Sequence, residues 1–286
     1  MNPPLPSLSY DQVKSLLVPR AAATHKGHYG HTLVVGGASG MGGACLMAAE
    51  AAARCGSGLT SVVTHPDHAG YFLLRRPELM VAAAATADVI NVLGARATTL
   101  VLGPGLGHGA WSAAMHSAAL ALATQRALPL VLDADGLNLL HGTPPAQPEA
   151  SKWILTPHAG EAARLLGQTR EQVEQDRESA ARTLQARYGG VAVLKGSGTL
   201  VCYREGNMQH LERCVHGNPG MATGGMGDVL SGILGALLAQ GLPLAQAARL
   251  GVCLHSKAAD LAAQTEGQRG LLATDLYPYL RTLLNP

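Results

Sequence analysis

The sequence predicts an α/β fold with a largely parallel central sheet and helices on both of its faces. Short apolar runs alternate along the chain with longer stretches of helical periodicity, and this alternation is typical of strand–helix–strand crossover units. Each apolar run ends in a polar or glycine-containing turn. Since no proline-, glycine- or serine-rich linker divides the 286 residues, we expect a single domain over residues 1–286. Residues 1–23 are expected to form an N-terminal extension.

The apolar runs are the expected strands, and the periodic stretches between them are the expected helices. The expected strands are 32–36, 59–64, 99–102, 130–133, 153–156 and 191–195, followed by a hairpin of 199–203 and 208–211. The expected helices are 43–55, 110–125, 160–166, 170–187, 225–240, 243–265 and a short one near 274–284. The proline-rich stretch 142–150 is short enough to be a surface loop. Ligands of open α/β sheets bind beyond the carboxyl ends of the strands, so the turns there are the candidate site.

Composition narrows the class of protein. A hydrophobic fraction of 47% with 14% charged residues is typical of a globular protein with a substantial core. A net charge of +2 without a basic run or an aromatic platform gives no indication of nucleic-acid binding. We find no apolar stretch long enough to span a membrane and no signal-peptide pattern. Five cysteines, with no close pair among them, suit a reducing compartment, so we expect a cytoplasmic protein.

A glycine run over residues 217–228, Gly-Asn-Pro-Gly-Met-Ala-Thr-Gly-Gly-Met-Gly-Asp, leads directly into an apolar helical stretch. Glycines allow positive φ and close backbone approach, and a helix start offers unpaired N–H groups and the positive end of its dipole. Together they form a cradle for an anion such as phosphate. Asp228 stands at its mouth, where it could accept a proton from a hydroxyl that receives phosphate. The alternative, that Asp228 only caps the helix, leaves five glycines in twelve positions unexplained.

Five other turns carry residues suited to the same site. They are residues 36–44, 103–107, 133–138, 156–161 and 195–199. Each also has a structural interpretation as a tight turn or a helix cap. We expect at least one of Asp133 and Asp135 to cap the following helix, and His158 with Glu161 could form a capping arrangement. Lys195 could be a solvated strand end, although the Gly-Ser-Gly-Thr after it suits contact with phosphate or ribose. The shared position of these turns favours a cleft for a nucleotide and a second substrate.

Several familiar site motifs are absent from the sequence. There is no Gly-Lys pair of a Walker-type phosphate loop, no G-x-G-x-x-G fingerprint, and neither G-x-S-x-G nor H-E-x-x-H. His25, His28 and His31 are evenly spaced but have no cysteine or carboxylate partner nearby. We therefore expect no metal site built from side chains alone. Magnesium would instead arrive with nucleotide phosphates.

Taken together, these segments resemble the ADP/ATP-dependent NAD(P)H-hydrate dehydratases, in particular the stand-alone bacterial form. The resemblance rests on Lys26-Gly27-His28-Tyr29-Gly30, the turns at 36–44, 103–107, 133–138 and 156–161, and the glycine run, in unbroken order from about residue 24 to 275. The glycine run is highly specific to that family. The resemblance implies the ribokinase-like fold, which small-molecule kinases of vitamin metabolism share. Ala159 stands where the family often has a proline, a departure that could loosen the loop but leaves His158 in place.

The resemblance also implies a repair reaction on a damaged cofactor. Hydrated NADH or NADPH carries a hydroxyl on its reduced nicotinamide ring. The enzyme would phosphorylate that hydroxyl with a nucleotide, and loss of phosphate would restore the dihydropyridine. Bacterial members typically use ADP, so we expect ADP giving AMP, with Mg²⁺ bridging the donor phosphates. An NAD(P)H-hydrate epimerase acts in the same pathway, and we expect it to be encoded separately because only a short extension precedes the dehydratase segment.

The resemblance assigns roles to individual residues. Ala44, Gly107 and His158 match positions that contact the hydrated cofactor, and Asp228 matches a further substrate contact and the general base. The implied nucleotide contacts are Lys195, Gly196, Ser197, Gly198, Thr199 and Gly227. The implied phosphate cradle is Gly224, Gly225, Met226 and Gly227, whose backbone N–H groups would stabilise the charge of the transferred phosphoryl group.

Two alternative functions stay open at this level. A kinase of the same fold that acts on a hydroxyalkyl heterocycle, such as a thiamine precursor, would release a stable phosphate ester instead of phosphate. A nucleotide-binding protein without catalysis would have no use for a carboxylate at Asp228. The Thr-Pro-His-Ala-Gly-Glu and Gly-Asn-Pro-Gly sequences favour the dehydratase. Helices rich in small residues suit close self-association, and the family often forms tetramers, so we expect a homo-oligomer.

Overall fold

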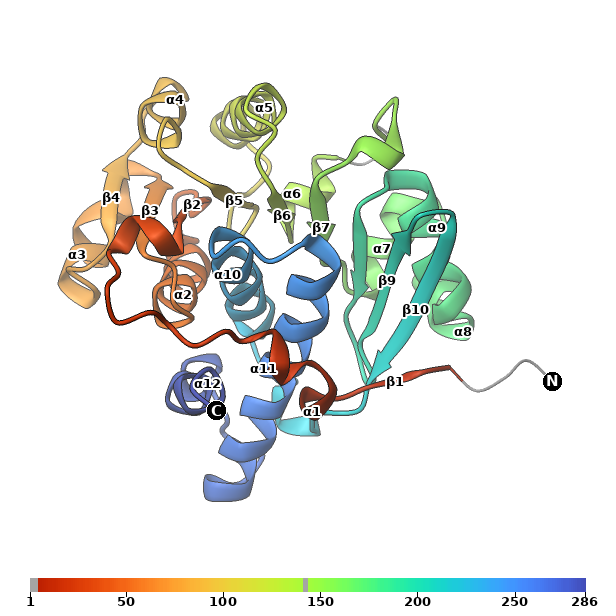
Figure 1. The fold of residues 1–286 in the computed structure, drawn as a ribbon. Helices are drawn as coiled ribbons and strands as arrows, with labels where there is room; N and C mark the ends of the chain where they lie inside the picture. Colours follow the sequence, from red (N-terminus) through yellow and green to blue (C-terminus); the bar gives the residue numbers. More distant parts are fainter. Residues whose placement is uncertain (1–4, 141–143) are drawn as a thin grey trace.

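The computed structural model describes residues 5–140 and 144–286, which form one ten-stranded sheet between two layers of helices (Figure 1). The strands are β1 (Ser7–Leu8), β2 (His31–Val35), β3 (Leu59–Thr64), β4 (Met80–Ala83), β5 (Thr99–Leu102), β6 (Leu130–Leu132), β7 (Trp153–Leu155), β8 (Val191–Leu194), β9 (Leu200–Glu205) and β10 (Met208–Cys214). Their order in the sheet is β1-β10-β9-β8-β7-β6-β5-β2-β3-β4. The strands from β8 to β4 in this order pair in parallel, whereas β9 is antiparallel to β8 and β10. The predicted largely parallel sheet and its hairpin are therefore confirmed.

Helices cover both faces of this sheet, as predicted (Figure 1). One face carries α1 (Tyr10–Val13), α2 (Gly42–Arg54), α3 (Ala69–Arg75), α10 (Met226–Ala239), α11 (Leu244–Glu266) and α12 (Leu276–Leu283). The other carries α4 (Asp88–Gly94), α5 (Ala110–Gln125), α6 (Asp135–Asn138), α7 (Ala159–Leu166), α8 (Arg170–Gln175) and α9 (Arg177–Tyr188). Among the helices that the structure describes, we find none whose length and apolar content would let it cross a membrane.

The sheet separates two apolar cores, because neighbouring side chains of a strand point to opposite faces. In β2, Val34 joins the core beneath α2 and α10, whereas Leu33 and Val35 join the core beneath α5 and α7. The α2 and α10 backbones approach closely, since a Cβ on Gly232 would lie 2.1 Å from the carbonyl oxygen of Ala48. Glycine at this position therefore lets α10 pack directly against α2.

Two segments of the fold differ from the expectations. The stretch 170–187, expected as one helix, is divided at Asp176, where the backbone leaves helical geometry (φ −139°, ψ 74°). The Asp176 carboxylate instead caps α9 by accepting a hydrogen bond from the N–H of Ser179 (2.9 Å). Residues 65–98, where no element was expected, form α3, β4 and α4. Strand β4 is an edge strand with partly exposed side chains, and its sequence lies in an alanine-rich run that has little strand propensity. Within the expected loop 142–150, residues 142 and 143 lie outside the described residues.

The N-terminal segment, expected as an extension, belongs to the folded unit where it is described. Ser7 and Leu8 pair in parallel with the end of β10. The Tyr10 hydroxyl donates a hydrogen bond to the carbonyl of Leu283 (2.5 Å), and its N–H donates to Nε2 of His216 (3.0 Å). The segment thus connects the edge of the sheet with the last helix.

Candidate active site

The turns singled out in the sequence meet at one edge of the sheet. Strands β2, β5, β6, β7 and β8 pair in parallel, so their carboxyl ends share that edge. The 36–44 turn touches the next turn through hydrogen bonds from the N–H of Gly37 to Pro104 (3.0 Å) and of Ala38 to Gly105 (2.7 Å). The N-terminus of α10 reaches the same edge: a Cβ on Gly227 would lie 3.2 Å from the Lys195 amine.

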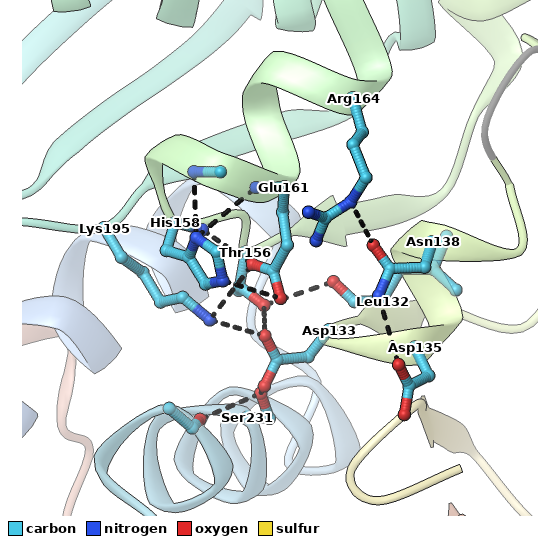
Figure 2. Close-up of polar contacts among 12 residues, drawn as sticks. Leu132, Asp133, Asp135, Asn138, Thr156, His158, Glu161, Arg164, Lys195 and Ser231 are labelled. Atoms are coloured by element: carbon cyan, nitrogen blue, oxygen red, sulfur yellow. Dashed lines mark hydrogen bonds and ion pairs between the residues drawn. The ribbon is translucent and has the colours of Figure 1, made fainter. Parts of the chain in front are cut away.

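Asp133 is the centre of a buried polar cluster at this edge (Figure 2). Its side chain follows β6 and is 1% exposed. One carboxylate oxygen accepts hydrogen bonds from Thr156 Oγ1 (2.8 Å) and Lys195 Nζ (2.7 Å), and the other accepts from Ser231 Oγ (2.7 Å). Asp133 therefore joins the ends of β6, β7 and β8 to the first turns of α10.

The cluster fixes the charges of its two central residues. Burial disfavours ionisation of Asp133, but Lys195 and the two hydroxyl donors hold the pKa of this carboxyl below its usual value. Burial likewise disfavours the charge on Lys195, yet Asp133 and Glu161 outweigh it and raise the pKa of the amine. The two groups therefore form a permanent ion pair on the floor of the site.

The expected capping role of Asp133 or Asp135 is wrong. The residue at the N-cap of α6 is Ala134, and no side chain caps this helix. Ala134 has φ 47° and ψ −119°, a conformation that costs a non-glycine residue about 1–3 kcal/mol. The bend separates the two carboxylates, so that Asp133 contacts Lys195 while Asp135 contacts the turn after β5.

Asp135 holds the turn that contains Gly107. Its carboxylate accepts hydrogen bonds from the N–H of Gly107 (2.8 Å) and from Asn138 Nδ2 (3.1 Å), and it lies 3.0 Å from His108 Nε2. The Asn138 side chain in turn accepts a hydrogen bond from Arg164 Nε of α7 (2.9 Å) (Figure 2). This second network fixes the turn from the side opposite to α2.

The predicted substrate contacts lie close to one another, Ala44 in the first turn of α2 and Gly107 in the turn after β5. A Cβ on Gly105 would lie 3.2 Å from the Cβ of Ala44, and a Cβ on Gly107 would lie 2.8 Å from the methyl group of Met41. Gly107 also has a positive φ of 73°. The chain is therefore closely packed at Gly107, where a side chain would collide with the exposed Met41 side chain.

His158 and Glu161 form the expected capping arrangement at the start of α7. Nδ1 of His158 accepts hydrogen bonds from the N–H groups of Gly160 (2.9 Å) and Glu161 (3.3 Å), and Glu161 accepts one from the N–H of His158 (2.7 Å). Burial and the nearby Lys195 lower the pKa of His158, so the ring is neutral and carries its proton on Nε2. Burial and Asp133 raise the pKa of Glu161. His158 thus offers an N–H donor at the surface of the site.

The glycine run builds an anion cradle at the N-terminus of α10. The N-cap residue is Gly225, with φ 91° and no side-chain cap, so the alternative in which Asp228 caps the helix is wrong. The first hydrogen bond of the helix joins the N–H of Val229 to Gly225 (3.0 Å). Within the described residues, no acceptor bonds the N–H groups of Met226, Gly227 and Asp228. These three donors and the positive end of the helix dipole suit a phosphoryl group.

Asp228 lies in that first turn and differs from Asp133 in its environment. In the described part of the chain it forms neither an ion pair nor a side-chain hydrogen bond. Burial raises the pKa of Asp228 to about 7, and the negative charge of Asp133 adds to this effect while Lys195 opposes it. A carboxylate with a pKa near neutrality is well matched to general-base catalysis.

The lead-in to the glycine run is held by α11. The Asp260 carboxylate accepts hydrogen bonds from the N–H of Gly217 (3.0 Å) and from Asn218 Nδ2 (3.0 Å). The Asn218 side chain also accepts a hydrogen bond from the N–H of Gly220 (3.0 Å). The Gly-Asn-Pro-Gly sequence therefore forms a turn that is fixed by hydrogen bonds and positions the cradle.

The predicted nucleotide loop, residues 195–199, follows β8 beside the cradle. Gly196 and Gly198 have positive φ angles of 146° and 66°, which other residues rarely adopt. Sequence reasoning did not identify Thr156 and Ser231 as partners of this region. Ser231 lies three residues after Asp228 on the same side of α10, which is the one sequence signal that could have found it.

No group of three or more histidine, cysteine, aspartate or glutamate side chains suited to a metal ion occurs among residues 5–140 and 144–286. His31 is buried and contacts Ser61 Oγ (2.8 Å), whereas the rings of His25 and His28 stack on one another with centroids 3.7 Å apart. The three evenly spaced histidines therefore do not converge on one point.

The sequence matches a family model described as NAD(P)H-hydrate dehydratase over residues 32–282. A bifunctional NAD(P)H-hydrate repair enzyme of Coxiella burnetii is 53% identical over 98% of this chain and 55% of its own length. An ADP-dependent (S)-NAD(P)H-hydrate dehydratase of Neisseria meningitidis is 41% identical over 93% of this chain and 88% of its own. The chain thus spans about half the length of the bifunctional relatives.

Solved structures with a similar fold include a member of the same family. A ribokinase-like superfamily protein of Enterococcus faecalis superposes with a TM-score of 0.87 at 31% identity, covering 98% of this chain and 95% of its own. The ADP/ATP-dependent NAD(P)H-hydrate dehydratase of Bacillus subtilis, co-crystallized with ATP/Mg²⁺, has a TM-score of 0.85 at 26% identity, covering 99% and 98%. The expected ribokinase-like fold is confirmed.

Proposed function

Because the chain belongs to the NAD(P)H-hydrate dehydratase family, we propose that it is an ADP-dependent (S)-NAD(P)H-hydrate dehydratase. ADP phosphorylates the ring hydroxyl of hydrated NADH or NADPH, and loss of phosphate yields NAD(P)H, AMP and phosphate. The observation that carries this proposal is Asp228, whose pKa is about 7. Neither its carboxylate nor the three adjacent N–H groups of α10 have a partner among residues 5–140 and 144–286. The ADP-dependent relative of Neisseria meningitidis supports the choice of nucleotide.

The phosphoryl-transfer step uses the cradle and the two charged groups beside it. Asp228 accepts the proton of the ring hydroxyl while the hydroxyl oxygen attacks the terminal phosphorus of ADP. The N–H groups of Met226, Gly227 and Asp228 stabilise the charge on the transferred phosphoryl group. Lys195, held by Asp133 at 2.7 Å, supplies positive charge next to Gly227. AMP leaves as the bond between the two phosphates breaks.

The elimination step makes small demands on the protein. The carbon–oxygen bond to phosphate breaks as the ring nitrogen donates its electron pair. The departing phosphate then takes a proton from the neighbouring ring carbon, so that the ring double bond returns. Phosphate is a good leaving group and needs no further acid. The cradle holds it as it departs.

The charge of the site fits Mg²⁺. Asp133, Glu161 and Asp228 act on one another electrostatically, with Lys195 as the cation among them. This excess of carboxylates suits a divalent cation, which prefers oxygen ligands and nucleotide phosphates. Glu161 would hold it together with the donor phosphates, and when bound it neutralises their charge. The relative from Bacillus subtilis was co-crystallized with ATP/Mg²⁺.

The remaining predicted residues have matching places. The proposed contacts of the hydrated cofactor are Ala44, Gly107 and the ring Nε2–H group of His158. The loop 195–199 and Gly227 are proposed to contact the adenine nucleotide. The loop provides backbone N–H donors that have no acceptor in the described chain.

The test is to incubate the protein with hydrated NADH, Mg²⁺ and either ADP or ATP, and to follow NADH absorbance. The proposal predicts recovery that needs both nucleotide and Mg²⁺ and is faster with ADP. No recovery with either nucleotide would reject it. A kinase of a hydroxyalkyl heterocycle would leave hydrated NADH unchanged and would accumulate a phosphate ester with its own substrate.

Compartment and partners complete the proposal. The five cysteines are free and buried, which supports a reducing cytoplasm. We propose that an NAD(P)H-hydrate epimerase acts in the same pathway, since the relatives that match this chain over about half their length are bifunctional repair enzymes. A homotetramer is expected, and light scattering measures it directly.

A further inference from the structure

Arg177, the first residue of α9, lies directly behind the loop 195–199. Its guanidinium donates hydrogen bonds to three carbonyls, those of Ser197 (2.6 Å), Leu194 (3.2 Å) and Lys195 (3.3 Å). The side chain is half-buried. One charged group therefore holds the backbone of the loop at three points, with hydrogen bonds stronger than those between neutral groups.

These bonds occupy carbonyl groups of the loop but not its N–H groups. The carbonyl of Gly196 accepts a hydrogen bond from Thr199 Oγ1 (3.2 Å), and that of Thr199 accepts one from the N–H of Cys214 (2.9 Å). By contrast, no acceptor in the described chain bonds the N–H groups of residues 196–199. With most of its carbonyls occupied, the loop offers mainly donors. Such a row of free N–H groups is suited to an anion.

Arg177 also gives the loop positive charge; Glu174 acts on it electrostatically but forms no ion pair with it in the described chain. Lys195 is paired with Asp133 and Glu161, and Arg213, which packs against Gly198, is paired with Glu178. Arg177 forms no ion pair with any described residue. Its charge therefore remains available to a ligand of the loop.

We propose that Arg177 is a positioning residue of the nucleotide site. It holds the loop carbonyls so that the N–H groups of residues 196–199 stay free for the phosphate-bearing part of an adenine nucleotide, and its charge favours that ligand. This inference rests on the proposed function, because it takes the ligand of the loop to be the nucleotide. Arg177 itself acts through the loop and touches no reacting atom.

The test compares Arg177→Gln and Arg177→Lys with a control on the same helix, Arg182→Gln, whose parent side chain is exposed and contacts Gln209. ADP affinity is measured by calorimetry, kinetic constants by NADH recovery, and folding by Tm. Losing charged hydrogen bonds predicts that Arg177→Gln weakens ADP binding and raises its KM by about tenfold to a hundredfold. The KM for hydrated NADH and the kcat at saturating ADP stay near the wild-type values. Arg177→Lys, which keeps the charge but not the fork, gives an intermediate loss, and Arg182→Gln gives none.

Several outcomes would overturn the inference. One is a folded Arg177→Gln variant that binds ADP as tightly as the wild type. Another is an equal rise in the KM of both substrates, which would indicate a merely structural role. If Arg177→Gln does not fold, wild-type ADP affinity in Arg177→Lys decides against it. Wild-type protein that binds no ADP also contradicts it. Wild-type protein that binds ADP through Arg177 but restores no NADH rejects the proposed function alone.

Discussion

Asp133 and Asp228 stand at the same edge of the sheet in opposite environments. Asp133 ends a strand and accepts hydrogen bonds from three side chains, and the Lys195 amine among them holds its pKa below the usual value. Asp228 lies in the first turn of α10, with no such partner in the described chain, and burial raises its pKa to about 7. The same chemical group is a fixed charge in one place and a proton acceptor in the other.

The difference follows from the elements that present the two groups. Parallel strands bring their carboxyl ends together, so Asp133 meets Thr156 and Lys195 from the two strands that follow β6 in the sheet. A helix N-terminus offers its own N–H groups to a ligand instead, and Asp228 is left for the substrate hydroxyl. Strand ends therefore build the support of the site, and the helix start performs its chemistry.

The largest expected effect is that of Asp228→Asn on turnover. Removing the general base lowers kcat by about 10²- to 10⁴-fold, while the fold and ADP binding are retained. Single-turnover kinetics and calorimetry measure the two effects separately. Activity near the wild-type level in this variant would make the assignment of the base wrong.

Asp133→Ala is expected to act mainly on stability. It leaves the half-buried Lys195 without its closest partner, and breaking a buried pair costs about 3–5 kcal/mol of unfolding free energy. Asp11→Ala is the matched control, since the ion pair of Asp11 with Lys14 is exposed to water and contributes little to stability. Urea titrations measure both. If Asp133→Ala lowers the free energy of unfolding no more than Asp11→Ala does, the buried pair contributes no more to stability than the exposed one, contrary to this prediction.

The pH dependence of stability should separate the two carboxylates. The folded pKa of Asp228, about 7, lies above its unfolded value of 3.8, so its contribution to stability is present below pH 3.8 and is lost as pH rises towards 7. Asp133 has a lowered folded pKa, so its contribution is present above the unfolded pKa and is lost as pH falls through the folded pKa. Urea titrations of wild type and Asp228→Asn should show the variant gaining relative stability between pH 4 and 7. A difference that is constant over this range would contradict the account.

The smallest expected effect is that of Ala134→Gly, which relieves the bend between Asp133 and Asp135. Glycine adopts the φ of 47° without strain, so the free energy of unfolding should rise by about 1 kcal/mol. Ala114→Gly, at an exposed position inside α5, should lower it by about the same amount. Thermal unfolding distinguishes the two signs, and a loss of stability in Ala134→Gly would show that the bend is not strained.

The fold could be predicted from the sequence where both faces of a strand are buried. The mainly apolar, fully buried runs of β2, β5 and β8 were identified because the parallel sheet is covered on both sides. Strand β4 and helix α3 were missed because they lie at the sheet edge, where partly exposed residues blur the pattern. The pairing of β1 with β10 joins Ser7 to Arg213, residues so far apart along the chain that no local pattern reveals it.

The candidate site could likewise be predicted only where its residues carry a local signal. The glycine run and the strand-end turns carry local signals, so the cradle and its neighbours could be predicted. A helix cap is the local interpretation of Asp133, but its actual partners Lys195 and Ser231 lie 62 and 98 residues away. Arg177 was likewise invisible, because its three acceptors are backbone carbonyls that carry no residue preference.

The products of a single reaction show most directly whether the protein couples repair of hydrated NADH to cleavage of ADP. Wild-type protein is incubated with hydrated NADH, Mg²⁺ and ADP, and NADH, AMP and phosphate are measured together. The account predicts one AMP and one phosphate for each NADH restored, with none of the three formed by Asp228→Asn at the same ADP occupancy. NADH restored without consumption of a nucleotide, or a stable phosphate ester in place of NADH, would contradict it.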